Sequence, residues 1–450
     1  MQGGIVAPLL VQKNNKTKLA YLPVGMLAFF IPSKNRCGRY AALTLIAWLL
    51  RTYKKNKTEN IMLNLKRAGR ALLAGAVASI LLTPMAMAAT INIGFTGPLS
   101  GGAALYGKDS LDGMKMAADE INSNGGVEVD GTQYKVKIVS YDDQYAPSKA
   151  AINAKRLVQA NKASVIFTPH SGGIFALQAF NENSNFLLMA NSSLPEISNK
   201  GNELTVRMPP LFTDYMDPFI THAMGTFGKR VAIANANHDY AKVWTKEFVP
   251  AWEAAGGEVV ANSPMDYNKS ADFYTGVSRA LQAKPDVLFV GGASEPTGLV
   301  MKQAIQLGFK GGFILMDQAK LAEVADIVGG MDQIEGAIGL PPLEAYGIDA
   351  AQRLVNRYKE EKKDRDPTTE VGTHYFSVHL VVEAMKQAGT VEDGRAIRAA
   401  MNDALGTLPA KYNVYAIQKI DQQGGFAGNT YYAVVKDGQL DVRQEASGSR

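Results

Sequence analysis

Cysteine is almost absent from this chain of 450 residues. The single cysteine is Cys37, so the sequence after residue 88 contains none. Neither a disulfide framework nor a metal site built from cysteine can therefore form there. The absence suits an oxidising compartment, where an unpaired thiol would be a hazard, although many cytosolic domains lack cysteine as well.

An excess of positive charge is also absent once the first 88 residues are set aside. These residues hold 13 of the 47 Lys and Arg and one of the 42 Asp and Glu, which leaves 34 basic and 41 acidic side chains and a formal charge of −7 on the remainder. This balance argues against a phosphate-binding surface as the main function of the protein. We expect no nucleic acid as a partner.

Hydrophobic runs long enough to cross a membrane are missing. The apolar run at residues 71–82 follows three basic residues and precedes a segment that ends in Ala86-Met87-Ala88. This three-part pattern predicts a secretory signal peptide at residues 62–88, cleaved after Ala88. The run is far shorter than the ~20 residues of a spanning helix. Because Ala89 rather than cysteine follows the cleavage site, we expect an exported, soluble protein without a lipid anchor.

Residues 1–61 precede the predicted signal peptide and would leave it internal. They contain two apolar runs, at 19–32 and 40–50, both too short to span a bilayer. We expect translation to begin at Met62 and residues 1–61 to be a misassigned upstream extension.

Short β-type runs alternate with helical patterns from Thr90 onward, which predicts an α/β fold with parallel sheets. The eight runs fall into two batches, one before Met208 and one after Lys229, so we expect two lobes. The predicted strands are residues 91–96, 135–141, 164–168, 186–190, 230–235, 257–262, 286–291 and 313–316. Later strands are expected at 338–339 and 412–420, with β-type residues at 431–435.

Prolines mark the places where the chain is expected to pass between the lobes. They restrict φ and end regular structure, as at Pro209-Pro210, at Pro341-Pro342 and at Pro409. A helix is expected between Gly107 and Gly125, because apolar residues recur there three or four positions apart. This leaves Tyr106 in the loop after the first strand.

Motifs of catalysis and cofactor binding are missing. The chain has no G-x-G-x-x-G after a strand, no G-x-x-x-x-G-K-[ST] and no G-x-S-x-G. Only His374 and His379 lie close in sequence, at a spacing that separates them around a helix. We therefore expect no metal, no cofactor and no enzymatic activity, although a Ser/His/Asp set assembled in space is not excluded by sequence.

Polar and small residues follow the predicted strands at their carboxyl ends, where open α/β sheets bind ligands. His170, Ser171, Gly172 and Gly173 come after the third strand, and Asn191, Ser192 and Ser193 come after the fourth. A helix that begins near Gly173 could hold a carboxylate through N–H and hydroxyl donors. The alternative is that these residues only cap the helix.

The second batch of strands has similar residues at its ends. Tyr240 follows the fifth strand by a few residues, Ser294 follows the seventh, and Asp317 directly follows the eighth. The Asp317 carboxylate would face the cleft between the lobes and could pair with an ammonium group. Its alternative role is as the cap of the next helix.

Together these residues resemble the type I periplasmic solute-binding proteins of ABC importers, in the branched-chain amino acid (leucine/isoleucine/valine-binding) group. The likeness covers nearly all of residues 90–443. The stretches that carry it are Leu99-Ser100-Gly101, Tyr106-Gly107, Gly113, Ala117, Ile121-Asn122, Gly125-Gly126, Tyr141-Asp142-Asp143, Asp239-Tyr240, Ala254-Ala255-Gly256-Gly257, Asp272-Phe273 and Gly291-Gly292.

The resemblance implies two Rossmann-like lobes joined by a three-crossing hinge that close on a small solute. With the prolines as crossings, the first lobe is expected at residues 89–208 plus 343–409, and the second at 211–340 plus 411–443. The implied function is periplasmic capture of a carboxylate-bearing solute for a membrane permease and its ATPase. We expect the protein to be a monomer. A sensor of the same fold is the alternative.

By the same resemblance, Tyr106 covers the ligand, Ser171, Gly172, Gly173, Ser192 and Ser193 hold its carboxylate, Tyr240 closes on it, and Asp317 takes its α-amino group. The chain departs from the pattern at Asn191-Ser192-Ser193, where a Pro-Gly-Ala-Thr-type turn is common, and at Ala293-Ser294, where amino acid binders offer tyrosine. These departures imply a roomier pocket, so aromatic acids, amides and urea are alternative solutes.

Overall fold

The computed structural model describes residues 6–13, 16–23, 89–363 and 365–446. The chain divides into two compact units, residues 1–86 and 87–450. In the first unit, β1 (Val6–Lys13) and β2 (Lys16–Pro23) form an antiparallel hairpin. The predicted signal peptide at 62–88 lies outside the described residues, as does most of the predicted upstream extension. No helix of the described part of the chain is long and apolar enough to cross a bilayer.

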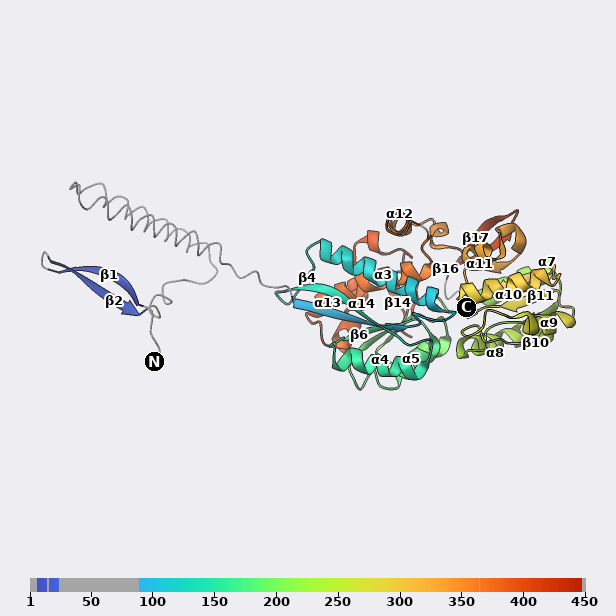
Figure 1. The fold of residues 1–450 in the computed structure, drawn as a ribbon, viewed down its shortest axis with the longest axis horizontal. Coiled ribbons are helices and arrows are strands. Elements are labelled where there is room, and N and C mark those ends of the chain that lie inside the picture. The colour runs from blue at the N-terminus through green and yellow to red at the C-terminus, as the bar shows by residue number, and fades with distance from the viewer. Residues whose placement is uncertain (1–5, 14–15, 24–88, 364, 447–450) are drawn as a thin grey trace. The chain divides into compact units, whose positions relative to one another are not determined.

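Two large sheets dominate the second unit, and we name the parts built on them the first and second lobes (Figure 1). The first sheet has six strands, parallel except for β4 at the edge, which pairs antiparallel with β5. In spatial order its strands are β4 (Val127–Val129), β5 (Thr132–Asp142), β3 (Ala89–Gly97), β6 (Val165–Thr168), β7 (Leu187–Ala190) and β8 (Thr205–Arg207).

The second sheet has seven strands; the first five pair in parallel, and the last two are added by antiparallel pairing. In spatial order they are β10 (Glu258–Asn262), β9 (Arg230–Ile233), β11 (Val287–Val290), β12 (Gly312–Leu315), β13 (Ile338–Gly339), β16 (Asn429–Lys436) and β17 (Gln439–Ala446). The predicted α/β fold with two lobes of parallel sheet is confirmed, and each of the eight strands predicted first coincides with an observed one.

Helices connect the strands of both sheets. They are α3 (Ala104–Ser123), α4 (Pro147–Gln159), α5 (Ser171–Gln178), α6 (Pro195–Asn199), α7 (Thr213–Thr226), α8 (Asp239–Ala254), α9 (Tyr274–Gln282), α10 (Ser294–Gln306), α11 (Leu321–Val328), α12 (Asp349–Glu361), α13 (Thr369–Ala388) and α14 (Gly394–Thr407). The described residues also form three short 3-10 helices, η2 (Met331–Ile334), η3 (Leu343–Tyr346) and η4 (Ala410–Tyr412).

The helix expected after Gly107 begins earlier than its sequence pattern suggests. Helix α3 starts at Ala104, so Tyr106 lies in its first turn and not in a loop, and that expectation was wrong. The predicted apolar face is correct, because Leu111, Met114 and Ala118 are all buried. The physical reason for the early start is that Gly107, without a side chain, lets the first turn approach the carbonyl of Pro98.

The strand predicted at residues 412–420 is wrong for most of its length. Only β14 (Lys419–Ile420) is extended, and it pairs with β15 (Phe426–Ala427). Asn413 explains the difference, because its side chain accepts from the Ile417 N–H at 2.9 Å and donates to the Ile417 carbonyl at 2.8 Å. These two bonds close a loop, so an extended conformation is excluded there.

The segment after Pro409 packs with the first sheet. Val414, Ile420 and Phe426 belong to the same buried cluster as residues of β3 and α13, and the Phe426 ring lies 5.3 Å from that of Phe376. We therefore infer that the chain makes its third crossing near Gly428, just before β16, rather than at Pro409. The rest of the division of the chain between the lobes stays a prediction.

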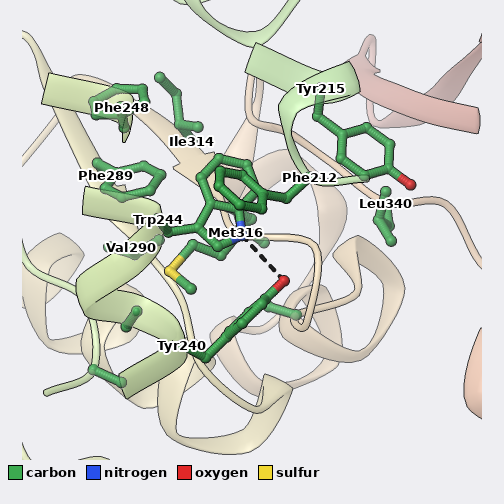
Figure 2. Close-up of a cluster of buried hydrophobic side chains, with 14 of the residues drawn as sticks. Phe212, Tyr215, Tyr240, Trp244, Phe248, Phe289, Val290, Ile314, Met316 and Leu340 are labelled. Carbon is green, nitrogen blue, oxygen red and sulfur yellow. Dashed lines mark hydrogen bonds between the residues drawn. The ribbon is translucent and has the colours of Figure 1, made fainter. Parts of the chain in front are cut away.

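An aromatic cluster fills the centre of the second lobe (Figure 2). The rings of Phe248 and Phe289 stack with centroids 4.1 Å apart, and Trp244 lies 4.6 Å from Phe212. All four side chains are fully buried. Burial of such rings is among the largest apolar contributions to stability. The cluster therefore gives the second lobe a rigid interior, and Trp244 extends from it to the functional site.

We expect Gly113→Ala to destabilise the protein by about 1–3 kcal/mol. A Cβ at Gly113 would collide with the backbone carbonyl of Val371, where α3 packs against α13. Gly406→Ala is the matched control, since a Cβ there meets nothing within 4 Å and alanine favours a helix. Urea unfolding measures both, and an equal effect of the two substitutions would contradict the packing argument.

Candidate functional site

A pocket lies where the carboxyl ends of the two sheets meet. It holds about 890 Å³ of space between protein atoms, part of it open to solvent. Its walls come from both lobes and contain many tyrosines. The tyrosines that line it are Tyr106, Tyr145, Tyr215, Tyr240, Tyr346, Tyr415 and Tyr431. Of the aliphatic residues, Met208, Leu340 and Ile417 contribute.

Asp317 lies at the centre of a hydrogen-bond network that joins the lobes. It follows β12, and its Oδ2 accepts from the Ser193 hydroxyl of the first lobe at 2.6 Å. Its Oδ1 accepts from Tyr240 and, at 3.1 Å, from Trp244 Nε1. Trp244 Nε1 also donates to the Tyr240 hydroxyl at 3.0 Å, the hydrogen bond that Figure 2 marks with a dashed line. The network therefore connects the first lobe to the aromatic cluster of the second.

Burial sets the electrostatics of this network. The Asp317 side chain is 7% exposed, and desolvation raises its pKa above the ordinary value for aspartate. Hydrogen bonds from Ser193 and Tyr240 oppose the rise because they stabilise the charged form. A buried carboxylate must be paired or hydrogen-bonded, so Asp317 requires these donors from both lobes.

The first lobe contributes a row of hydroxyl and amide groups. Ser171 Oγ lies 2.7 Å from Ser192 Oγ, and Asn191 Nδ2 donates to the Tyr106 hydroxyl at 3.1 Å. Ser193 Oγ lies 2.7 Å from the Tyr240 hydroxyl across the cleft. All these side chains line the pocket. They offer the donors that a carboxylate needs.

Gly172 and Gly173 are not among the residues that line this pocket. The Gly173 amide donates to His170 Nδ1 at 3.0 Å, so His170 caps α5. Because Nδ1 accepts, Nε2 carries the proton and donates to Asp143 Oδ2 at 3.0 Å. The N–H of Gly173 is thus already used by the cap, and helix α5 begins at Ser171, close to Gly173 as predicted.

Ser294 does not line this pocket, although it shares a neighbouring cavity with Tyr106. It is the first residue of α10, and its Oγ accepts from the Lys320 backbone N–H at 3.0 Å. It lines a smaller cavity of about 250 Å³ together with Asp109, Glu323 and other residues. The structure therefore brings together Tyr106, Ser171, Ser192, Ser193, Tyr240 and Asp317 of the predicted set.

Lys320 and Glu370 form a buried ion pair that the sequence analysis missed. Lys320 Nζ lies 2.9 Å from Glu370 Oε1, and both side chains are less than a tenth exposed. Lys320 follows β12 in the second lobe, whereas Glu370 belongs to the first turn of α13. Lys320 Nζ also donates to the carbonyls of Asp317 and Gln318. The pair adds a second polar link across the cleft.

Tyr145 is a further site residue that the sequence analysis did not identify. Its ring stacks on His170 with centroids 4.6 Å apart and lies 5.2 Å from His238 of the second lobe. Gln144 and Tyr145 both have positive φ, 54° and 62°, which makes the tight turn that directs Tyr145 toward the pocket. The Tyr141-Asp142-Asp143 motif marked this segment, but no periodicity indicated the turn.

A two-lobed α/β protein with its polar pocket between the lobes has the architecture of a solute receptor that closes like a trap. The sequence model of the periplasmic binding protein family matches residues 90–439, and the chain belongs to this family.

Curated relatives and solved structures agree with that assignment. The Leu/Ile/Val-binding protein of Citrobacter freundii is 27% identical over 298 residues, which cover 66% of this chain and 79% of the relative. A branched-chain amino acid transporter substrate-binding protein of Streptococcus pneumoniae, in complex with isoleucine, has a TM-score of 0.63 at 21% identity and covers 79% of this chain and 99% of its own. A solute-binding protein from R. palustris, in complex with benzoate, has a TM-score of 0.66 at 17% identity. The match covers 80% of this chain and 98% of the R. palustris chain.

We expect the stability of the protein to fall as the pH is lowered from about 6.5 to about 4, in part because of His374. This fully buried ring donates to the Glu370 carbonyl behind the pocket wall, and burial lowers its pKa from 6.5 to about 4. Since the unfolded chain binds the proton more tightly, the free energy of unfolding decreases over this window, by roughly 3 kcal/mol for this residue.

Urea unfolding at several pH values, on the protein and on His374→Gln, measures this contribution. The variant should show a shallower loss of stability between pH 6.5 and 4, because glutamine does not titrate. His379, whose pKa burial lowers to about 3, remains in both proteins and supplies the common background. An identical pH dependence in the two proteins would contradict the role of His374.

Proposed function

We propose that this protein is the substrate-binding component of an ABC importer. It captures a small carboxylate-bearing solute, a branched-chain or related amino acid, and delivers it to a membrane permease and its ATPase. The observation that carries the proposal is the pocket whose polar groups, Ser171, Ser192, Ser193 and Asp317, come from both lobes. The relatives named for leucine, isoleucine and valine support this solute class.

Each polar group has a distinct role in this proposal. The hydroxyls of Ser171 and Ser192, 2.7 Å apart, donate to the carboxylate of the solute. Tyr106, in the first turn of α3, covers the solute with its ring. Asp317 attracts the α-amino group, since a buried carboxylate stabilises a nearby cation. Tyr240 closes on the solute from the second lobe.

The mechanism is a shift of population between open and closed arrangements of the lobes. A solute that contacts both lobes binds the closed arrangement better and so favours it. Ser193 and Tyr240 already meet at 2.7 Å across the cleft, so closure needs little rearrangement of these side chains. A permease partner would recognise the closed arrangement and not the open one. No bond of the solute is broken, and the protein has no catalytic role.

The proposed location is the periplasm, reached through the signal peptide at residues 62–88 and cleavage after Ala88. The mature protein is soluble and acts as a monomer. Periplasmic binding proteins give their family its name, and that name supports the location.

A thermal-shift screen of the purified, refolded protein tests the function. The probes are leucine, isoleucine and valine, with benzoate, urea and small amides as comparison solutes. A ligand that binds only the native state stabilises it by about 2.7 kcal/mol at a hundredfold excess over Kd. We expect the branched-chain amino acids to stabilise the protein. We also expect them to be recovered unchanged after long incubation. Stabilisation by none of the probes, or turnover of a bound one, would refute the proposal.

Tyr106→Ala should weaken binding of the solute by about 10- to 100-fold, the value of one well-buried aromatic ring. Tyr106→Phe is the matched control: it keeps the ring and loses only the hydroxyl that accepts from Asn191, so its effect should be much smaller. Isothermal titration calorimetry with leucine measures both. Unchanged affinity in Tyr106→Ala would exclude Tyr106 from the binding site.

A further inference from the structure

One buried polar atom of the pocket has no hydrogen-bond partner among the described residues. This atom is Oε1 of Gln318, a side chain that is 6% exposed and lines the pocket. Seven other buried side-chain atoms also lack partners, but none belongs to a residue that lines the pocket. A buried acceptor without a partner is costly, so its occurrence in a binding pocket indicates a donor on the ligand.

The surroundings hold the Gln318 side chain in place. Its Nε2 donates to the Tyr145 hydroxyl of the first lobe at 3.2 Å. Its own backbone carbonyl accepts from Lys320 Nζ at 3.0 Å. With the backbone and one end of the amide held, the other end, Oε1, has no partner among the described residues.

Asp317 has too few remaining lone pairs to satisfy an ammonium group by itself. Its Oδ1 already accepts from Tyr240 and Trp244, which use both lone pairs of that oxygen. Its Oδ2 accepts from Ser193 and retains one lone pair. An ammonium has three donors, so it needs acceptors beyond this one.

We propose that Gln318 is a specificity-determining residue, whose Oε1 accepts a hydrogen bond from the α-amino group of the solute while Asp317 Oδ2 accepts another. The inference rests on the proposed function and extends it: the solute must carry an amine as well as a carboxylate. Asp317 supplies the negative charge, and Gln318 supplies the acceptor that the closed network lacks. A carboxylic acid without an amine would leave Oε1 unpaired in the closed protein.

The experiment compares two pairs of probes that differ only in the amine. The pairs are leucine with 4-methylpentanoate and phenylalanine with 3-phenylpropanoate, and calorimetry gives the affinity of each. The proteins are the unmodified chain, Gln318→Met, Gln318→Glu and the control Gln352→Met. Methionine keeps the length of the side chain without the acceptor, and glutamate keeps an acceptor and adds charge. Gln352 is exposed on α12 and outside the pocket lining.

The unmodified protein should bind the amine of at least one pair more tightly than its partner acid. Gln318→Met should lose about 10- to 100-fold in affinity for the amine and little for the acid, because only the amine uses Oε1. Gln318→Glu should retain binding of the amine, and Gln352→Met should behave as the unmodified protein. Circular dichroism and the Tm of each variant verify its fold.

Three results would overturn the inference while the proposed function stands. They are acids that bind as tightly as their amines, an equal loss for both members of a pair in Gln318→Met, and a loss for the amine in Gln318→Glu as large as in Gln318→Met. The last result would show that the solute presents an acceptor to Gln318. Binding of neither member of either pair would refute the proposed function itself, and the inference with it.

Discussion

The buried carboxylate of Asp317 is the constraint on which the site depends. A charge taken out of water is tolerated only when hydrogen bonds replace its hydration. The donors come from positions 193, 240 and 244, which lie in a loop of the first lobe and on helix α8 of the second. Separating the lobes removes Ser193 from Asp317, so the same carboxylate that stabilises the closed arrangement also makes closure sensitive to what enters the pocket.

Two further polar contacts also join the lobes and are lost when the lobes separate. The Lys320–Glu370 pair is buried and joins the two lobes. The ring of Tyr145 lies against His238, and the Tyr145 hydroxyl accepts from Gln318 Nε2. Polar links of this kind contribute little net stability, because the desolvation of both partners offsets their attraction. Instead, they determine how the two lobes are oriented relative to each other. A receptor that must close and reopen benefits from links that are specific in direction and modest in free energy.

The aromatic cluster of the second lobe explains how the Asp317 carboxylate is kept in a fixed position. Trp244 packs against Phe212 and Phe289 in the interior and donates its Nε1 proton to Asp317 at the surface of the pocket. Rigid interiors pack densely and do not deform continuously, so the position of the carboxylate is set by the core and not by a mobile loop.

The amino-acid sequence by itself determined the two-lobed α/β fold and the polar strand ends, since periodicity and turn residues are local signals: Ser192, Ser193 and Asp317 were found because strands end beside them. Only the tertiary structure decided which of these groups meet. It assigned the Gly173 amide to His170, placed Ser294 in a second cavity, and joined Lys320 to Glu370. It also added Tyr346, Tyr415 and Tyr431 to the pocket wall. The Lys320–Glu370 pair joins residues 50 positions apart, and no local pattern in the sequence identifies such a partner.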